Sequence, residues 1–375
     1  MNINDRVLRQ EERAIFSLRS LYGRYGYALY KMSKFEEYEF YIRNKDFLLS
    51  DAIITFNDPG GKLLALKPDV TLSIIRQTGD LPGRVHKVYY NENVYRVSKG
   101  TGSYKEIMQV GLECIGDIDR YHTCEVLMLA AESLRTIAPE GVLDVSHQGV
   151  ITALLEASGV SAEAQQALLT YMGEKNAHEA ARLCAEEGVA PALAEALNTL
   201  ITTYGAPQTV LPVLRKALAG LVDDAPLNEL AQVMEAFAGT PLEGMLRLDF
   251  SVTGNRKYYN GLVFKGFVPG IPESVLSGGR YDPLLRGMGR TAGALGFAVY
   301  LDRLEMLDAT AEPYDVDTVL LYDDSTSPAA LCKAVQTLAA DGTTVVARRH
   351  KPEKMTYRRL LTIREGEVTA DETDA

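Results

Sequence analysis

The segment from Tyr89 to Gly116 constrains the fold most, because its residues alternate as in two long strands joined by a Gly-rich loop. On the second strand Gln109 and Glu113 share one face, since side chains of a strand alternate between its two sides. Burying a polar face is costly unless it binds a polar partner. With Arg96, these groups suit a small zwitterion better than an apolar ligand. An antiparallel sheet with one solvated face explains the same alternation, so this stretch leaves both interpretations open.

The composition excludes several classes of protein. The 375 residues suffice for about two or three domains, and a net charge of −11 argues against a large nucleic-acid-binding surface. The four cysteines are dispersed without the spacing of metal ligands or disulfide frameworks, so we expect no metal site. The N-terminus lacks a signal-peptide pattern, and no apolar run approaches the ~20 residues of a membrane span. We therefore expect a soluble, cytoplasmic protein.

The N-terminal part predicts helices beside an antiparallel sheet. Apolar residues at helical spacing over residues 6–25, with Asp5 as cap and Gly26 as stop, predict the first helix. The runs 52–56 and 62–66 flank the turn sequence NDPGG, which predicts a hairpin. The next helix is expected to begin after Pro68, with Asp69 and Thr71 marking its start. At such a position Asp and Thr cap the helix more often than they bind a ligand.

Later segments divide the chain into three parts. Residues 150–242 are rich in Ala and Leu with helical periodicity, which predicts an all-helical insert. Strand patterns then return, so we expect residues 1–149 and 243–312 to form one α+β domain. Residues 313–375 predict a small C-terminal α/β unit. Its acidic tail, EGEVTADETDA, is expected to be disordered.

No familiar catalytic motif is present. The loop SKGTGSYK differs from the phosphate-binding GxxxxGK[ST] motif and joins two strands instead of opening a helix. The five histidines are scattered without an obvious nucleophile, so each is expected to be structural. The polar candidates that remain are distant from one another in sequence: Asp69, Thr71, Arg96, Gln109, Glu113, Tyr258 and Tyr259. Two glycines, Gly278 and Gly279, permit the backbone to approach a ligand closely.

Several motifs together resemble the histidyl-tRNA synthetase family of class II aminoacyl-tRNA synthetases. The hairpin YYNENVYR…YKEIMQVGLECIG resembles motif 2, SGGRYDPLL and GFAVYLDRL resemble the motif 3 region, and YYNGLVF is similar to the histidine-specific signature. The resemblance covers nearly the whole chain. It implies a class II antiparallel sheet flanked by helices, with a helical insert between motif 2 and the histidine signature.

The departures from this pattern concern the groups that handle phosphate. GNRKYY replaces RGLDYY, so Gly254 stands where an arginine is expected, and Arg256 is the nearest residue that could replace that cation. Losing one preorganised charge typically costs on the order of 10²–10³ in rate, and lysine does not copy a bidentate guanidinium. Arg96 persists, but the other charged positions of the motif 2 loop have changed to Ser98, Lys99, Ser103 and Lys105.

The positions that the family uses for histidine itself largely persist. By resemblance, a carboxylate and a phenol hold the imidazole while a second carboxylate and an amide hold the α-ammonium. The resemblance therefore implies an amino-acid pocket without activation chemistry. Its expected residues are Asp69, shortened from glutamate, with Thr71, Arg96, Gln109, Glu113, Tyr258 and Tyr259.

This combination resembles the regulatory subunits of ATP phosphoribosyltransferase, synthetase relatives that partner a short catalytic chain in the first step of histidine biosynthesis. VLDVSHQGVITALLEASG also resembles their form of that segment. The resemblance implies a non-catalytic, cofactor-free subunit that forms a hetero-octamer with the short catalytic ATP phosphoribosyltransferase chain, senses histidine and binds no tRNA. It also implies a dimer, although Ser33 replaces the motif 1 proline at that interface. Two alternatives stay open: a divergent, active histidine–tRNA ligase, and a stand-alone paralogue that binds or activates an amino acid.

Overall fold

The computed structural model describes residues 8–48, 53–79, 83–98, 101–307, 314–340, 342–364 and 366–372. The chain divides into two compact units, which we describe separately. The larger unit is Gln10–Met306, and the smaller comprises Leu307–Ala375 with Met1–Arg9. None of the helices in the described ranges is both long and apolar enough to span a membrane.

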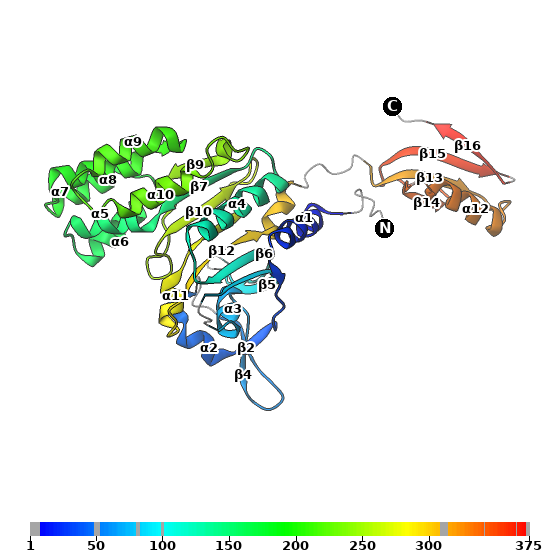
Figure 1. Ribbon diagram of the computed structural model, residues 1–375. Coiled ribbons are helices and arrows are strands. Elements are labelled where there is room, and N and C mark those ends of the chain that lie inside the picture. Colours follow the sequence, from blue (N-terminus) through cyan, green and yellow to red (C-terminus); the bar gives the residue numbers. More distant parts are fainter. Residues whose placement is uncertain are drawn as a thin grey trace. The chain divides into compact units, whose positions relative to one another are not determined.

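A nine-stranded sheet in the order β1-β5-β6-β12-β11-β10-β7-β9-β8 forms the centre of the larger unit (Figure 1). The expected antiparallel pairing is confirmed from β5 to β7, whereas β1 with β5 and β7 with β9 pair in parallel. Parallel neighbours need a long crossover, and the helical segment supplies it between β7 and β9. The strands are β1 (Ala28–Leu29), β5 (Val85–Val97), β6 (Tyr104–Gly116), β7 (Val142–His147), β8 (Tyr204–Gly205), β9 (Leu246–Asp249), β10 (Leu262–Phe267), β11 (Leu276–Arg280) and β12 (Gly293–Tyr300).

The predicted central hairpin is confirmed as β5 and β6. Each strand has 13 residues, and the register places Arg96 opposite Lys105 and Glu92 opposite Gln109. Gln109 and Glu113 therefore share one face of the sheet with Gly111 between them. The strand alternation that is visible in the sequence thus fixes which side of the sheet is polar.

Two helices, α1 (Gln10–Arg24) and α4 (Arg120–Ile137), pack on the opposite, apolar face of the sheet. The ring of Tyr22 meets that of Phe297 edge-on at 6.0 Å, and its hydroxyl lies 2.9 Å from that of Ser133. The first helix begins at Gln10, later than the sequence pattern predicts, and Asp5 lies outside the described residues. It ends before Gly26, whose φ of +80° favours glycine.

The polar face of the sheet is partly covered by short helices. Apolar residues of α2, α3 and α11 form one core cluster with β5, β6 and β12 residues. The hairpin predicted around NDPGG is confirmed as β3 and β4, which form a separate three-stranded sheet with β2. These elements are β2 (Phe35–Glu37), α2 (Tyr38–Arg43), η1 (Lys45–Phe47), β3 (Thr55–Asn57), β4 (Leu63–Leu66), α3 (Thr71–Gln77) and α11 (Asp282–Gly287).

A helical segment follows β7, and β8 is its single strand among the described residues. Side chains of Ser161 and Asn176 cap two of the helices by accepting backbone N–H groups. The boundaries expected for this insert, 150–242, stay a prediction. Its helices are α5 (Gln148–Ala157), α6 (Ala162–Gly173), α7 (Ala177–Glu186), α8 (Pro191–Thr202), α9 (Pro207–Leu218) and α10 (Ala225–Glu235). The short 3₁₀ helices η2 (Glu243–Met245) and η3 (Leu301–Leu307) follow α10 and β12, respectively.

The smaller unit holds a four-stranded sheet in the order β14-β13-β15-β16, with one helix, α12. The expectation of a disordered acidic tail is wrong as far as residue 372, because β16 pairs antiparallel with β15. The backbone of an edge strand can pair with its neighbour even when its side chains are acidic. Composition alone therefore does not reveal that this segment is a strand. The elements are β13 (Val316–Tyr322), α12 (Pro328–Ala339), β14 (Val345–Arg348), β15 (Tyr357–Arg364) and β16 (Glu367–Glu372).

Candidate functional site

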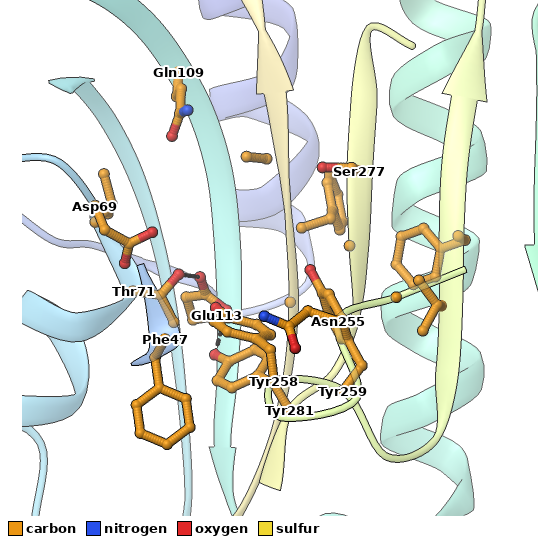
Figure 2. Close-up of a pocket in the computed structure, with 18 of the residues that line it drawn as sticks. Phe47, Asp69, Thr71, Gln109, Glu113, Asn255, Tyr258, Tyr259, Ser277 and Tyr281 are labelled. Carbon is orange, nitrogen blue, oxygen red and sulfur yellow. Dashed lines mark hydrogen bonds between the residues drawn. The ribbon is translucent and has the colours of Figure 1, made fainter. Parts of the chain in front are cut away.

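A cavity of about 280 Å³ lies on the polar face of the large sheet (Figure 2). Its floor is formed by strands β6, β12, β11 and β10. The start of α3 forms one wall, and the turn before β10 forms another. The seven residues singled out from the sequence all line it: Asp69, Thr71, Arg96, Gln109, Glu113, Tyr258 and Tyr259.

Glu113 lies in the middle of this cavity and is only 2% exposed. Its Oε1 accepts a 2.7 Å hydrogen bond from the Thr71 hydroxyl, and its Oε2 accepts one from the Tyr281 hydroxyl (Figure 2). Burial raises the pKa of Glu113 to about 8, although these two hydrogen bonds oppose the rise and the Asp69 carboxylate adds to it. The carboxyl is therefore largely neutral at pH 7, and a cationic group beside it would favour the charged form.

A second carboxyl, Asp69, lies next to Arg96 at the wall formed by α3. Its Oδ1 accepts a 2.9 Å hydrogen bond from the backbone N–H of Leu72, so it satisfies a donor in the first turn of this helix, although Val70 is the N-cap residue. Burial raises the pKa of Asp69, while the Leu72 N–H and the positive charge of Arg96 act against the rise. Arg96 is held in place because its Nε donates to the carbonyl of Pro68 at 3.1 Å.

Three tyrosines form an aromatic wall around the carboxyl of Glu113. The rings of Tyr258 and Tyr259 are 4.6 Å apart, and those of Tyr258 and Tyr281 are 5.5 Å apart. Burial raises the pKa of all three phenols, so each is neutral at ordinary pH. A Cβ atom on Gly279 would lie 2.8 Å from the Tyr259 ring. Only glycine therefore lets this ring lie against the sheet.

The turn that carries Tyr258 and Tyr259 is anchored to the strand ends. Asp282 Oδ2 accepts hydrogen bonds from Asn260 Nδ2 at 3.0 Å and from Arg280 Nε at 2.9 Å, and Asp282 Oδ1 accepts from the Ala294 N–H at 2.9 Å. One buried carboxylate thus ties the turn to β11 and β12. This arrangement orders the aromatic wall before any ligand enters.

Several residues of the cavity were not singled out from the sequence. Tyr281 lies inside the SGGRYDPLL segment, but its contact with Glu113 spans 168 residues and leaves no local signal. Ser277 and Tyr300, whose hydroxyl groups are 2.6 Å apart, close the end of the cavity away from Asp69. Phe47 of η1 and Asn255 also line it. Lys99 of the motif 2 loop lies outside the described residues.

Positive charge is scarce in the cavity. Among the described residues that line it, the cations are Arg96 and Lys265. Arg303 packs over the Tyr300 ring at 4.6 Å and pairs with Glu273 at 2.8 Å. Within the described ranges, no cluster of three or more His, Cys, Asp or Glu side chains is suited to a metal ion.

Arg256, the nearest residue that could replace the missing cation at position 254, does not take that place. Its guanidinium donates to Gln165 Oε1 at 2.6 Å and lies 3.6 Å from Glu156, and it does not line the cavity. A Cβ atom on Gly254 would lie 2.8 Å from the Tyr259 ring. The aromatic wall therefore fills the space that a side chain at position 254 would need.

Comparisons with known proteins agree with this fold. The family model described as histidyl-tRNA synthetase matches residues 2–304. An ATP phosphoribosyltransferase regulatory subunit from Moorella thermoacetica is 30% identical over 79% of this chain and 77% of its own length. A Bacillus halodurans structure described as an ATP phosphoribosyltransferase regulatory subunit/histidyl-tRNA synthetase is 22% identical with a TM-score of 0.70, over 94% of this chain and 93% of that chain.

A second similar structure comes from the ATP phosphoribosyl transferase (HisG:HisZ) complex of Thermotoga maritima. It has a TM-score of 0.61 at 18% identity and covers 80% of this chain and 98% of that chain. The likeness to the two solved structures shows the class II synthetase-like fold, and the family model and the Moorella relative show the kinship. The chain therefore belongs to the histidyl-tRNA synthetase family that includes the regulatory subunits of ATP phosphoribosyltransferase.

Proposed function

We propose that the chain is a non-catalytic regulatory subunit of an ATP phosphoribosyltransferase and that its cavity binds free histidine. The observation that carries this proposal is a cavity that combines apolar walls with a few convergent polar groups, and whose cations among the described residues are Arg96 and Lys265. Adenylate formation requires several fixed positive charges around the phosphates. An amino acid needs only a few directed hydrogen bonds and one or two charges.

The cavity offers complementary groups for each end of histidine. Glu113 and the phenol of Tyr258 suit the imidazole, while Asp69 and Gln109 suit the α-ammonium group. Thr71 and Tyr259 complete the walls, and Arg96 supplies positive charge for the carboxylate. The burial of Glu113, at 2% exposure, makes its interaction with a ligand strong, because the surroundings are poorly solvated.

Calorimetry on the isolated chain tests histidine binding. We expect wild-type protein to bind histidine and to melt at a higher temperature as histidine is added. Glu113→Ala should lose about 2–5 kcal/mol of binding free energy, which converts a micromolar site to roughly millimolar or beyond. Glu187→Ala, at an exposed position, is the matched control and should bind as wild type does. Absence of binding to wild type, or equal binding by Glu113→Ala, contradicts the pocket.

The proposed partner is a short catalytic phosphoribosyltransferase chain. This rests on the names of the relatives and on the complex that contains a similar chain. We propose that the two proteins form a hetero-octamer in which the present chain self-associates as a dimer. Native co-purification followed by light scattering tests the assembly. Adding the chain to the purified catalytic subunit should raise ATP phosphoribosyltransferase activity, and no change in rate would oppose the regulatory role.

Histidine-dependent pyrophosphate exchange distinguishes a regulator from a ligase. The match to the synthetase family keeps the ligase as the competing function. Because the described lining of the cavity supplies only the two cations Arg96 and Lys265, we expect no exchange with histidine and ATP. Exchange at rates ordinary for an enzyme, ~1–10³ per second, would overturn the non-catalytic proposal.

A further inference from the structure

We infer that Arg256 is a positioning residue that couples the cavity to the first two helices of the helical segment, α5 and α6. Arg256 belongs to the same turn as Tyr258 and Tyr259 but extends away from the cavity. It donates to Gln165 of α6 at 2.6 Å and lies 3.6 Å from Glu156 of α5. The ion pair with the exposed Glu156 contributes little. The hydrogen bond to Gln165 is therefore the main link of Arg256.

The beginning of the turn is tied to α5 by a second contact. The Gly254 N–H donates to Gln148 Oε1 at 3.2 Å, and the Gln148 N–H donates to the carbonyl of Gly261 at 2.8 Å. Gln148 is the first residue of α5 and is 1% exposed. Both ends of the turn thus contact one buried residue of the helical segment, the first through its side chain and the second through its backbone.

The side-chain amide of Gln148 is only partly satisfied in this arrangement. Its Nε2 is buried and has no hydrogen-bond partner among the described residues. An unsatisfied buried donor is unfavourable, so a shift of the turn that supplies an acceptor would be stabilising.

The turn itself is tight enough to transmit such a shift. The N–H groups of Tyr258 and Tyr259 both donate to the carbonyl of Asn255 at 2.8 Å. Asn255 and Gly254 line the cavity and also a cleft of about 1080 Å³ beside α6. Movement on the α6 side therefore moves the aromatic wall on the cavity side.

The biological role of this coupling rests on the proposed histidine binding. The coupling transmits the effect of that binding to the helical segment. A ligand that contacts Tyr258 and Tyr259 favours one position of the turn, and hence the contact between Arg256 and Gln165. Coupling is reciprocal, so breaking this contact must weaken the ligand's affinity by the same factor by which the ligand strengthens the contact. Glu113 binds the ligand directly, whereas Arg256 acts through the turn.

Calorimetry on the full chain tests the effect on affinity. We expect Arg256→Ala and Gln165→Ala each to weaken histidine binding by roughly fivefold or more, and the double variant to be no weaker than either single variant. Arg256→Lys, which keeps a donor for Gln165, should retain most of the affinity. Arg182→Ala on α7, whose partners are Glu179 and Glu186, should bind as wild type. Wild-type affinity in Arg256→Ala, or additive losses in the double variant, would overturn the coupling.

Hydrogen exchange of the free chain tests the coupling without a ligand. Gln165→Ala removes a side chain on α6, yet we expect faster exchange of the Tyr258 and Tyr259 amides. With histidine, α6 amides should exchange more slowly in wild type and not in Arg256→Ala. Unchanged exchange of both tyrosine amides in Gln165→Ala overturns the coupling, whether or not histidine binds. Failure of wild type to bind histidine overturns only the proposed ligand.

Discussion

Gly296 of β12 stands directly opposite Glu113 of β6, so close that a Cβ atom on Gly296 would overlap Oε2 of that carboxyl. The glycine is therefore a requirement for the buried position of Glu113. The same carboxyl is held by Thr71 and Tyr281, so it has little room to move aside. One missing side chain thus creates the space for the central polar group of the cavity.

Gly296→Ala should abolish histidine binding, because the new methyl group displaces the Glu113 carboxyl from Thr71 and Tyr281. Overpacking of this kind typically costs about 1–3 kcal/mol of stability, so the melting temperature should fall as well. Gly244→Ala is the control, since nothing lies within 4 Å of a Cβ at that position. Calorimetry at a temperature where both variants remain folded measures the effect. Undiminished binding by Gly296→Ala would show that the carboxyl is not part of the site.

Glu113 also predicts a pH dependence of stability. Its pKa is about 8 in the folded protein against an ordinary value of 4.5. As pH rises from about 4.5 to about 8, the unfolded chain gives up this proton first, so the free energy of unfolding falls. The loss is at most about 1.4 kcal/mol per pH unit and ends above pH 8. Urea denaturation at pH 5.5 and pH 8 should show a smaller decrease in Glu113→Gln than in wild type. Equal decreases in the two proteins would refute the raised pKa.

Local sequence patterns predicted the parts of the site that local interactions determine. The two-residue alternation placed Gln109 and Glu113 on one face, because strand geometry alone sets that relation. The contact of Tyr281 with Glu113 and the direction of Arg256 toward α6 join distant segments, so no nearby residue signals them. The same reason hides the parallel pair of β7 and β9, which depends on how the intervening helices pack. Sequence spacing did not predict that the seven cavity residues lie together. Only the family resemblance predicted it.

Restoring an arginine at position 254 should not restore amino-acid activation. In Gly254→Arg the Cβ atom would approach the Tyr259 ring to 2.8 Å, so the aromatic wall must shift before the guanidinium reaches the cavity. We expect no pyrophosphate exchange and weaker histidine binding. Gly244→Arg, at an open position, controls for the added charge. Exchange activity in Gly254→Arg would mean that a single residue separates this chain from a ligase.

Binding of tRNA should be weak at physiological salt. The densest basic stretch, residues 348–359, lies in the smaller unit, and two of its arginines have partners there: Arg349 pairs with Asp324 at 2.7 Å, and Arg359 donates to Thr318 at 2.6 Å. The rest of the chain is acidic, with a net charge of −11 overall, which repels the phosphate backbone.

Filter binding at two salt concentrations measures both the affinity and its salt dependence. Changing Arg348, Arg349, Arg358 and Arg359 to Glu should alter neither appreciably, since few phosphates are neutralised at this stretch in the first place. Tight binding with a steep salt dependence that disappears in the fourfold variant would instead identify this stretch as an RNA-binding surface.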